Sequence, residues 1–121
     1  MRVRSHRDLR IWQKAIELAR ESYLLTNRFP REEAFGLTAQ IKRSASSVPF
    51  NIAEGNGRLY RRDYLRFLAI ANGSLSELDS QLELARQLGY ADPAAFERVF
   101  ELHNHVGRML TLLMRRLRES E

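Results

Sequence analysis

Apolar side chains recur at alternating three- and four-residue steps along the last third of the sequence. This spacing puts all of them on one face of an α-helix, whereas the side chains of a strand change sides at every residue. Asp92 and Pro93 come just before the series, and both residues favour a helix start. The sequence therefore predicts a helix over about 93–118, and the members of its apolar stripe are Phe96, Val99, His103, Val106, Leu110, Leu113 and Leu117.

A second helix is predicted upstream from leucines that are seven residues apart. Leu68, Leu75 and Leu82 form this series. A parallel series of the same face contains Leu65, Ala71, Leu78 and Ala85. Sustained heptad spacing is typical of helices that pack lengthwise in bundles. We predict a helix over about 61–88, ended by the glycine at position 89.

Two further amphipathic helices are predicted in the first half of the chain. The first spans about 8–27 and is capped by Asp8; its main stripe is Leu9, Trp12, Ile16, Ala19 and Tyr23, widened by Ile11, Ala15 and Leu18. The second spans about 32–55; its stripe is Phe35, Leu37, Ile41, Ala45, Val48 and Ile52. Pro49 lies inside this pattern, so a kink or a short break is predicted there.

The connections between the four predicted helices are short, so consecutive helices should run antiparallel. The 121 residues suffice for one domain. The sequence therefore predicts an all-α, antiparallel, up-and-down four-helix bundle that forms a single domain over residues 1–121. No apolar run approaches the roughly 20 residues of a membrane span, and there is no cysteine. We expect a cytoplasmic protein with no membrane partner.

The titratable residues do not match a known catalytic or metal-binding pattern. His103 and His105 are two positions apart, so on a helix they point about 200° away from each other. The di-iron bundles need a histidine three residues after a glutamate, and Asn104 stands at that place after Glu101. We predict no catalytic residues, no metal, no cofactor and no enzymatic activity. His103, on the apolar stripe, is interpreted as a histidine of the core or of a subunit interface.

Arginine dominates the charge of the chain. Lys plus Arg is 20 against 15 acidic residues, a net charge of +5, and only Lys14 and Lys42 are lysines. The guanidinium group binds phosphate or carboxylate in a planar, two-pronged way that an ammonium group does not match. A GC-rich genome also produces an arginine-rich composition. The placement of the arginines is therefore more informative than their number.

Three arginine clusters should meet at one end of the bundle. In an up-and-down bundle, the starts of the first and third helices and the end of the fourth lie together. The clusters are Arg2, Arg4, Arg7 and Arg10; then Arg58, Arg61, Arg62 and Arg66; then Arg115, Arg116 and Arg118. Tyr60 and Tyr64 lie among them and can stack on bases. We call this set of arginines and tyrosines the arginine-rich end.

Two interpretations of the arginine-rich end are open. The first is a binding site for RNA, DNA or an acidic protein partner. The second is a solvated end whose arginines are partly paired with Glu54, Asp63 and Glu119. Several acidic residues lie away from this end, on the third and fourth predicted helices. In a homo-oligomer they would face basic residues of a neighbouring copy, such as Arg20 or Arg43; they are Glu77, Asp79, Glu83, Glu97 and Glu101.

Several segments resemble a known family, the bacterial four-helix bundle proteins encoded in intervening sequences of 23S ribosomal RNA genes. The resemblance runs from about residue 8 to residue 117. It is carried by residues 8–15 (DLRIWQKA), 29–33 (FPREE), 36–43 (GLTAQIKR), 48–55 (VPFNIAEG) and 67–78 (FLAIANGSLSEL). The family often has arginine where this chain has Asn72.

The resemblance implies an antiparallel four-helix bundle that assembles as a homopentamer and has no catalytic residues. The function of the family is poorly defined. A distant relative, the pentameric accessory protein of diversity-generating retroelements, binds a reverse transcriptase and RNA, which suggests a nucleic-acid-processing protein as a partner. Asn51, Glu54 and Gly55 match motif positions of the family. We interpret Asn51 and Glu54 as structural residues that bond the backbone near Pro49 or cap the third helix; contact with a ligand is the alternative.

Two hypotheses about function follow. The first is a pentameric adaptor that binds RNA, DNA or a nucleoprotein through the arginine-rich end. The second is a structural or protein-partner module that binds no nucleic acid.

Overall fold

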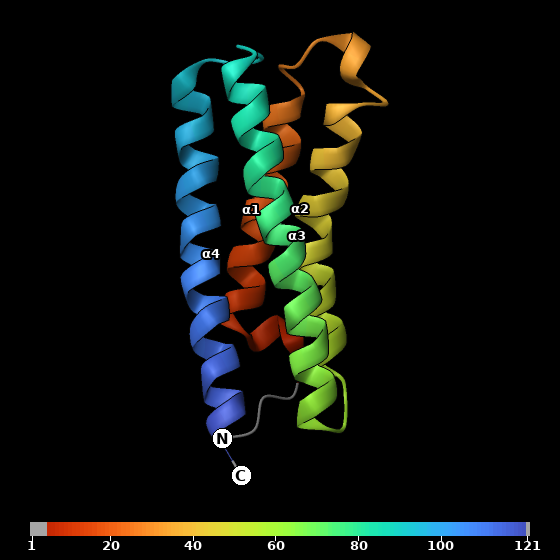
Figure 1. Cartoon of the computed structure of the whole chain (residues 1–121), viewed down its shortest axis with the longest axis vertical. Coiled ribbons are helices and arrows are strands. Elements are labelled where there is room, and N and C mark those ends of the chain that lie inside the picture. Colours follow the sequence, from red (N-terminus) through yellow and green to blue (C-terminus); the bar gives the residue numbers. More distant parts are fainter. Residues whose placement is uncertain (1–4, 121) are drawn as a thin grey trace.

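Four long helices make up almost all of the structure. The computed structural model of the chain describes residues 5–120. The helices are α1 (Arg10–Thr26), α2 (Leu37–Asn56), α3 (Arg61–Gln87) and α4 (Pro93–Glu119), with short 3-10 helices at His6–Asp8 and Arg31–Glu33. Consecutive helices run in opposite directions along the long axis of the molecule (Figure 1). The predicted antiparallel four-helix bundle is therefore present.

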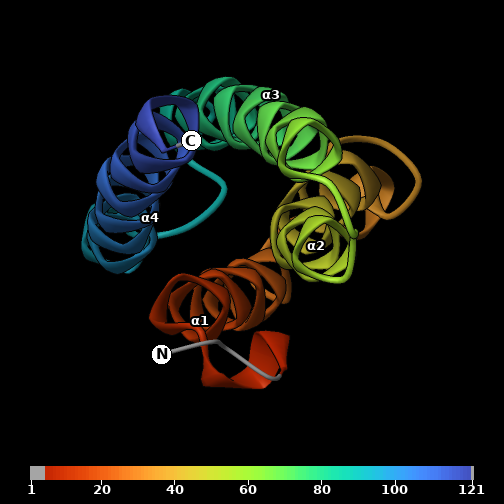
Figure 2. The same ribbon diagram turned by 90° about the horizontal axis from the view of Figure 1, so that it is seen from below.

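The helices are arranged in a ring in chain order when the bundle is viewed along its axis (Figure 2). Each helix packs against its two neighbours, and the contact between α1 and α4 closes the ring. Helices at opposite corners, α1 with α3 and α2 with α4, make no close backbone contact within residues 5–120. No helix of this part of the chain is long and apolar enough to cross a membrane.

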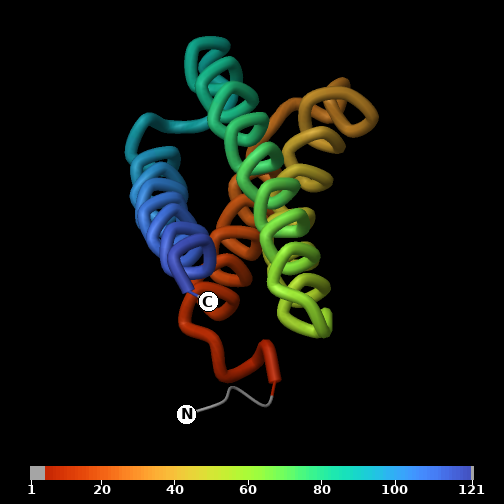
Figure 3. Tube along the Cα trace, turned by 60° about the horizontal axis from the view of Figure 1, so that its bottom comes forward, coloured from red at the N-terminus to blue at the C-terminus, as the bar shows by residue number. Residues whose placement is uncertain are grey.

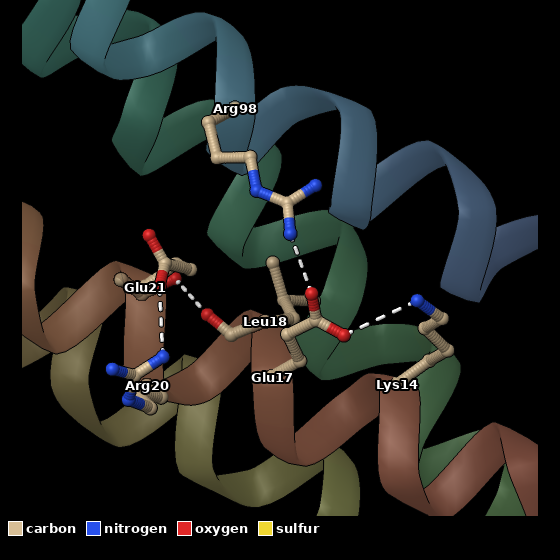
Figure 4. Close-up of polar contacts among 7 residues, drawn as sticks. Lys14, Glu17, Leu18, Arg20, Glu21 and Arg98 are labelled. Atoms are coloured by element: carbon tan, nitrogen blue, oxygen red, sulfur yellow. Dashed lines mark hydrogen bonds and ion pairs between the residues drawn. The ribbon is translucent and has the colours of Figure 1, made fainter.

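An ion-pair cluster joins α1 to α4 where the ring closes. The Glu17 carboxylate accepts hydrogen bonds from Lys14 Nζ at 3.2 Å, on its own helix, and from Arg98 Nη2 at 2.5 Å, on α4 (Figure 4). The hydrogen bond from Lys14, with the charges of Lys14 and Arg98, lowers the pKa of Glu17. A carboxylate shared between two cations stays ionised at lower pH and so keeps the two helices linked.

The heptad pattern of α3 predicted its buried face correctly. Leu68, Leu75, Leu78 and Leu82 are buried, together with Ala71 and Ala85, and Leu65 is partly buried. These side chains meet those of the other three helices in one continuous core. Leucines at heptad spacing bury one face along the whole length of a helix.

Two predicted stripes are displaced in the structure. On α1 the buried face carries Ile11, Ala15 and Leu18, whereas Tyr23 of the predicted main stripe is 41% exposed. On α4 the core contains Leu102 and Met114, which the predicted series left out, while Leu113 and Leu117 are only partly buried. A straight helix turns by about 20° per heptad relative to a 3.5-residue repeat, so the buried face of a long helix drifts away from a strict series.

The starts of the first two helices differ from the prediction. Asp8 belongs to the 3-10 helix His6–Asp8 and does not cap α1, which begins after Leu9 without a side-chain cap. Helix α2 begins at Leu37, and Phe35 of its predicted stripe is fully exposed. The reason is the Glu33 carboxylate, which accepts from the Leu37 backbone N–H at 2.9 Å and caps the helix from outside it.

Helix α2 is continuous through Pro49, so the predicted short break is absent. Pro49 is buried in the middle of the helix. Ser47 Oγ lies 2.7 Å from Ser74 Oγ of α3, and Asn51 Nδ2 donates to the Ser47 carbonyl at 2.8 Å. These bonds on either side of the proline, together with its burial, hold the helix in place where one backbone hydrogen bond is lost.

Candidate nucleic-acid interface at the arginine-rich end

The residues of the three arginine clusters that the structure describes gather at one end of the molecule. This end contains the start of α1, the connection from α2 to α3 and the end of α4 (Figures 1 and 3). Arg61 Nη1 donates to Ser120 Oγ at 3.2 Å, so the start of α3 is directly linked to the end of α4. Arg2 and Arg4, which belong to the first predicted cluster, lie outside the described residues.

Part of this surface is hollowed between α3 and α4. We call this the end hollow; its volume is about 640 Å³, and it is lined by Tyr60, Arg61, Arg62, Leu65 and Arg118. Three guanidinium groups and one tyrosine ring thus surround a single depression. Tyr60 is 60% exposed, so its ring is available for stacking.

The arginines of the end hollow have no acidic partner among residues 5–120. Within residues 5–120, no carboxylate oxygen lies within 4.0 Å of a side-chain nitrogen of Arg61, Arg62 or Arg118. The same holds for Arg115 and Arg116. Pairing with Asp63 and Glu119, which the alternative interpretation expects, does not occur in this part of the chain. Several positive charges at this end therefore have no ion-pair partner within the part of the chain that the structure describes.

Two other arginines of the second cluster are held by neighbours. Arg58 Nη2 donates to Glu54 Oε2 at 2.7 Å, the one expected ion pair that is present. The guanidinium of Arg58 also lies 4.6 Å from the ring centroid of Phe67, and that of Arg66 lies 5.4 Å from it. Both distances allow a cation–π interaction. Arg58 and Arg66 are thus oriented by the protein itself.

The first arginine cluster lies beside the end of α2. The 3-10 helix His6–Asp8 contacts α2, and a depression of about 480 Å³ between them is lined by His6, Phe50, Ala53, Glu54, Gly57 and Arg58. The Arg7 guanidinium lies 5.6 Å from the Trp12 ring centroid, while Arg10 is exposed in the first turn of α1. These basic groups extend the charged surface beyond the end hollow.

Tyr64 has a different environment from Tyr60. It is partly buried and packs against the core, and this burial raises the pKa of its hydroxyl. A ring fixed between helices is much less available for base stacking than an exposed one. Of the two tyrosines predicted for the site, only Tyr60 is therefore well placed to stack.

Gly55 has a packing role that the sequence interpretation missed. Gly55, at the predicted end of the second helix, is buried inside α2, which continues to Asn56. A Cβ atom on Gly55 would lie 2.9 Å from Phe67 Cβ and 2.9 Å from Tyr64 Cδ1. The missing side chain lets α2 and α3 approach closely. No local signal marks this role, because the two aromatic residues lie 9 and 12 positions further along the chain.

Asn51 bonds within its own helix. Its amide donates to the carbonyl and the hydroxyl of Ser47, two residues before Pro49. Glu54 pairs with Arg58, and the start of α3 has no side-chain cap. Neither residue therefore caps the third helix.

A second depression, unforeseen in the sequence, lies between α3 and α4. We call it the α3–α4 groove; its volume is about 640 Å³ and it is lined by Asn72, Leu75, Ser76, His103, Asn104, Gly107, Arg108, Thr111, Leu112 and Arg115. His103 Nε2 lies 2.7 Å from the Leu75 carbonyl oxygen, so the histidine bridges the two helices. The polar series Asn104, Arg108, Thr111 and Arg115, at helical spacing beside the apolar stripe, was the available signal.

Fold and surface together define a class of protein: a small antiparallel four-helix bundle with a basic end. In residues 5–120, no three histidine or acidic side chains gather as they would around a metal ion. Residues 7–112 match the sequence pattern of the 23S rRNA-intervening sequence protein, and the chain belongs to that family.

A solved relative shows the same fold. It is a protein of unknown function from the S23 ribosomal protein family of Bacteroides thetaiotaomicron, 23% identical in sequence, with a TM-score of 0.77. The similarity covers 86% of this chain and 97% of the relative. No curated protein gives a significant match to the sequence.

Proposed function

We propose that the protein is a non-enzymatic, self-assembling adaptor that binds RNA or DNA, alone or within a nucleoprotein, through its arginine-rich end. The end hollow is the observation that carries this proposal. It combines Arg61, Arg62 and Arg118, which have no carboxylate partner within residues 5–120, with the exposed ring of Tyr60.

The chemistry of the end hollow suits a phosphodiester chain. Each arginine that contacts a phosphate displaces condensed counterions, which makes the affinity fall steeply with added salt. Tyr60 can add stacking on an unpaired base, which is tolerant of base identity. Free guanidinium groups need no rearrangement of internal ion pairs before they bind. A ligand of this kind would be held mainly by its backbone, with weak sequence preference.

Self-assembly is the second part of the proposal. The family resemblance points to a homopentamer. Exposed carboxylates on α3 and α4, at Glu77, Asp79, Glu97 and Glu101, have no ion-pair partner in the described part of the chain and suit a basic surface of a neighbouring copy. A cyclic assembly repeats the arginine-rich end once per subunit, which strengthens binding of a long polyanion by multivalency. We place this assembly in the cytoplasm. Light scattering at known concentration measures the number of subunits.

The nucleic-acid part is tested by binding of single-stranded RNA and DNA oligonucleotides at low salt. The triple variant Arg61→Ala, Arg62→Ala, Arg118→Ala should lose at least ten-fold in affinity (about 1.4 kcal/mol), and its salt slope should fall by about 2. The matched control is Arg28→Ala, Arg31→Ala, Arg86→Ala. It removes three exposed arginines near the opposite end and changes the net charge equally. Failure of the wild-type protein to bind either nucleic acid would refute this part.

The surroundings of the hollow favour a second candidate, a protein-partner module. Leu59 is 81% exposed and Phe50 is 65% exposed, and both lie near Arg58. Exposed apolar side chains next to basic ones are typical of protein interfaces. A partner that is retained after nuclease treatment and is lost from a Phe50→Ser, Leu59→Ser variant would support this second candidate.

A further inference from the structure

The α3–α4 groove carries positive charge and no negative charge. Among the side chains that line it, Arg108 and Arg115 are basic, and none is a carboxylate. The remaining polar groups are the amides of Asn72 and Asn104 and the hydroxyls of Ser76 and Thr111. Amides and hydroxyls both donate and accept hydrogen bonds, as the edges of unpaired bases require.

The groove adjoins the end hollow along α4. Arg115 lines the groove, and Arg118, one helical turn further on, lines the end hollow. From Arg108 to Arg118 the helix rises by about 15 Å. The three arginines therefore form a basic track that begins at the end of the bundle and follows its side.

The track is bounded by acidic residues on the side away from the arginine-rich end. Glu101 on α4 lies just before the groove residues His103 and Asn104 in the helix, and on α3 Glu77 and Asp79 lie just after Ser76. These carboxylates have no ion-pair partner in residues 5–120. The basic track therefore covers the halves of α3 and α4 nearest the arginine-rich end, and the acidic residues lie beyond it.

Gly107 keeps the groove open although the fold does not require a glycine there. A Cβ atom at this position would lie 3.5 Å from Leu75 Cδ2, an ordinary contact. Glycine is less favourable than alanine inside a helix, so its presence is unexplained by the packing of this chain. A glycine in the lining does leave space for a group that enters the groove.

His103 presents one ring nitrogen that lacks a partner. Because a carbonyl oxygen only accepts, Nε2 carries the proton in the 2.7 Å bond to the Leu75 carbonyl. In the neutral ring Nδ1 is then an acceptor, and it is buried without a hydrogen-bond partner in the described structure. The histidine therefore shapes the wall of the groove through its bond to Leu75 and offers no accessible acceptor to a ligand.

We infer that single-stranded nucleic acid bound at the end hollow continues into the α3–α4 groove, where Arg108 and Arg115 hold its phosphates and the amides and hydroxyls contact its unpaired bases. This inference rests on the proposed function and extends it by naming the path and the form of the ligand. An RNA duplex does not fit this chemistry, because its bases are already paired and its deep, narrow major groove is closed to side chains.

The experiment compares labelled oligonucleotides of about 4 to 16 nucleotides, a range that matches single-strand binding sites. In the wild-type protein, affinity should rise with length until the groove is filled. The variant Asn104→Ala, Arg108→Ala changes two groove residues outside the arginine-rich end. It should bind the longest oligonucleotide about ten-fold more weakly and bind the shortest one as the wild type does. Both side chains are exposed, so the change should leave the fold intact.

A second variant tests whether the ligand needs the open space of the groove. Gly107→Leu puts a side chain into it and should also weaken binding of the long oligonucleotide. Its control is Gly73→Leu on α3, where an added Cβ meets no atom within 4 Å and where the residue does not line the groove. The control should bind like the wild type, and circular dichroism checks the helical content of both.

Each other outcome overturns the inference in a distinct way. If both groove variants bind all lengths normally while the end-hollow triple variant does not, the groove is not used and the proposed function stands. If the wild type binds no oligonucleotide, both fail. If the groove variants change the mass in light scattering and their affinities follow the loss of assembly, the groove is occupied by a second copy of the chain instead.

Discussion

The two sides of α3 are packed in opposite ways. Toward α2, the helices meet so closely that a Cβ on Gly55 would come within 2.9 Å of Phe67 Cβ, and serine hydroxyls bond across the contact at 2.7 Å. Toward α4, a groove of about 640 Å³ opens, and a Cβ on Gly107 would make an ordinary 3.5 Å contact. Two glycines inside helices thus serve different purposes: one permits packing and the other leaves a surface unfilled.

The largest expected effect concerns the α2 side of α3. Gly55→Ala should lower the free energy of unfolding by about 1–3 kcal/mol, the usual cost of an extra group in a filled site. The added Cβ meets Phe67 Cβ and the backbone oxygen of Tyr64, neither of which can move freely. Urea denaturation measures the change. A variant as stable as the wild type would show that α2 and α3 can separate slightly without loss.

A smaller loss is expected from the serine pair on the same side. Ser74→Ala should cost about 1 kcal/mol, the usual value of one hydrogen bond, and Ser47→Ala should cost more, because the Ser47 hydroxyl also accepts from Asn51 Nδ2. Because the hydroxyls bond to each other, the double variant should cost less than the sum of the two. The comparison uses midpoints of urea denaturation. Additive losses would indicate that the two hydroxyls act independently.

The same glycine-to-alanine change should have the opposite sign on the α4 side. Gly107→Ala should raise the free energy of unfolding by about 0.5–1 kcal/mol, because alanine favours the helix and the Cβ meets only Leu75 at 3.5 Å. Measured beside Gly55→Ala, it isolates the effect of the neighbouring helix from that of the residue type. Destabilisation by Gly107→Ala would mean that α3 and α4 are closer than they are in this structure.

The smallest effect concerns Glu33, in the connection between α1 and α2, and its contact with Tyr90, in the connection between α3 and α4. Glu33 accepts from the Tyr90 hydroxyl at 2.6 Å and from the Leu37 N–H at 2.9 Å; the bond from Tyr90, then that from Leu37, lowers the pKa of Glu33 below its ordinary value of 4.5. A lowered pKa contributes stability that is present above the unfolded value and is lost as the pH falls through the folded one.

Glu33→Gln should therefore lower the melting temperature slightly at neutral pH, and the difference from the wild type should shrink below the ordinary pKa of the carboxyl. Tyr90→Phe is the control, because it removes the hydrogen bond from the Tyr90 hydroxyl and keeps the bond from the Leu37 N–H. A difference that does not change between neutral and acidic pH would show that the charge of Glu33 is unimportant.

The prediction of the candidate site depended on topology more than on motif. Short connections and antiparallel order were enough to predict that the starts of α1 and α3 lie near the end of α4. In an up-and-down bundle, the starts of odd-numbered helices and the ends of even-numbered helices lie at the same end. Whether Arg58 was free or paired with Glu54, and whether Tyr64 was exposed or packed, depended on contacts between side chains. The α3–α4 groove depended on the distance between two helices, for which the sequence has no direct signal.

Apolar spacing by itself determined the number of helices, their approximate limits and their antiparallel order, because the period of a helix and the length of a connection are local properties. The tertiary structure decided which part of the broad apolar stripe of α1 is fully buried: Ile11 and Leu18 are buried, Leu9 is only partly buried, and Tyr23 is 41% exposed. It also decided what each glycine does. The apolar residues of α1 and the two glycines look alike along the chain, and they differ only in which side chains of other helices lie opposite them.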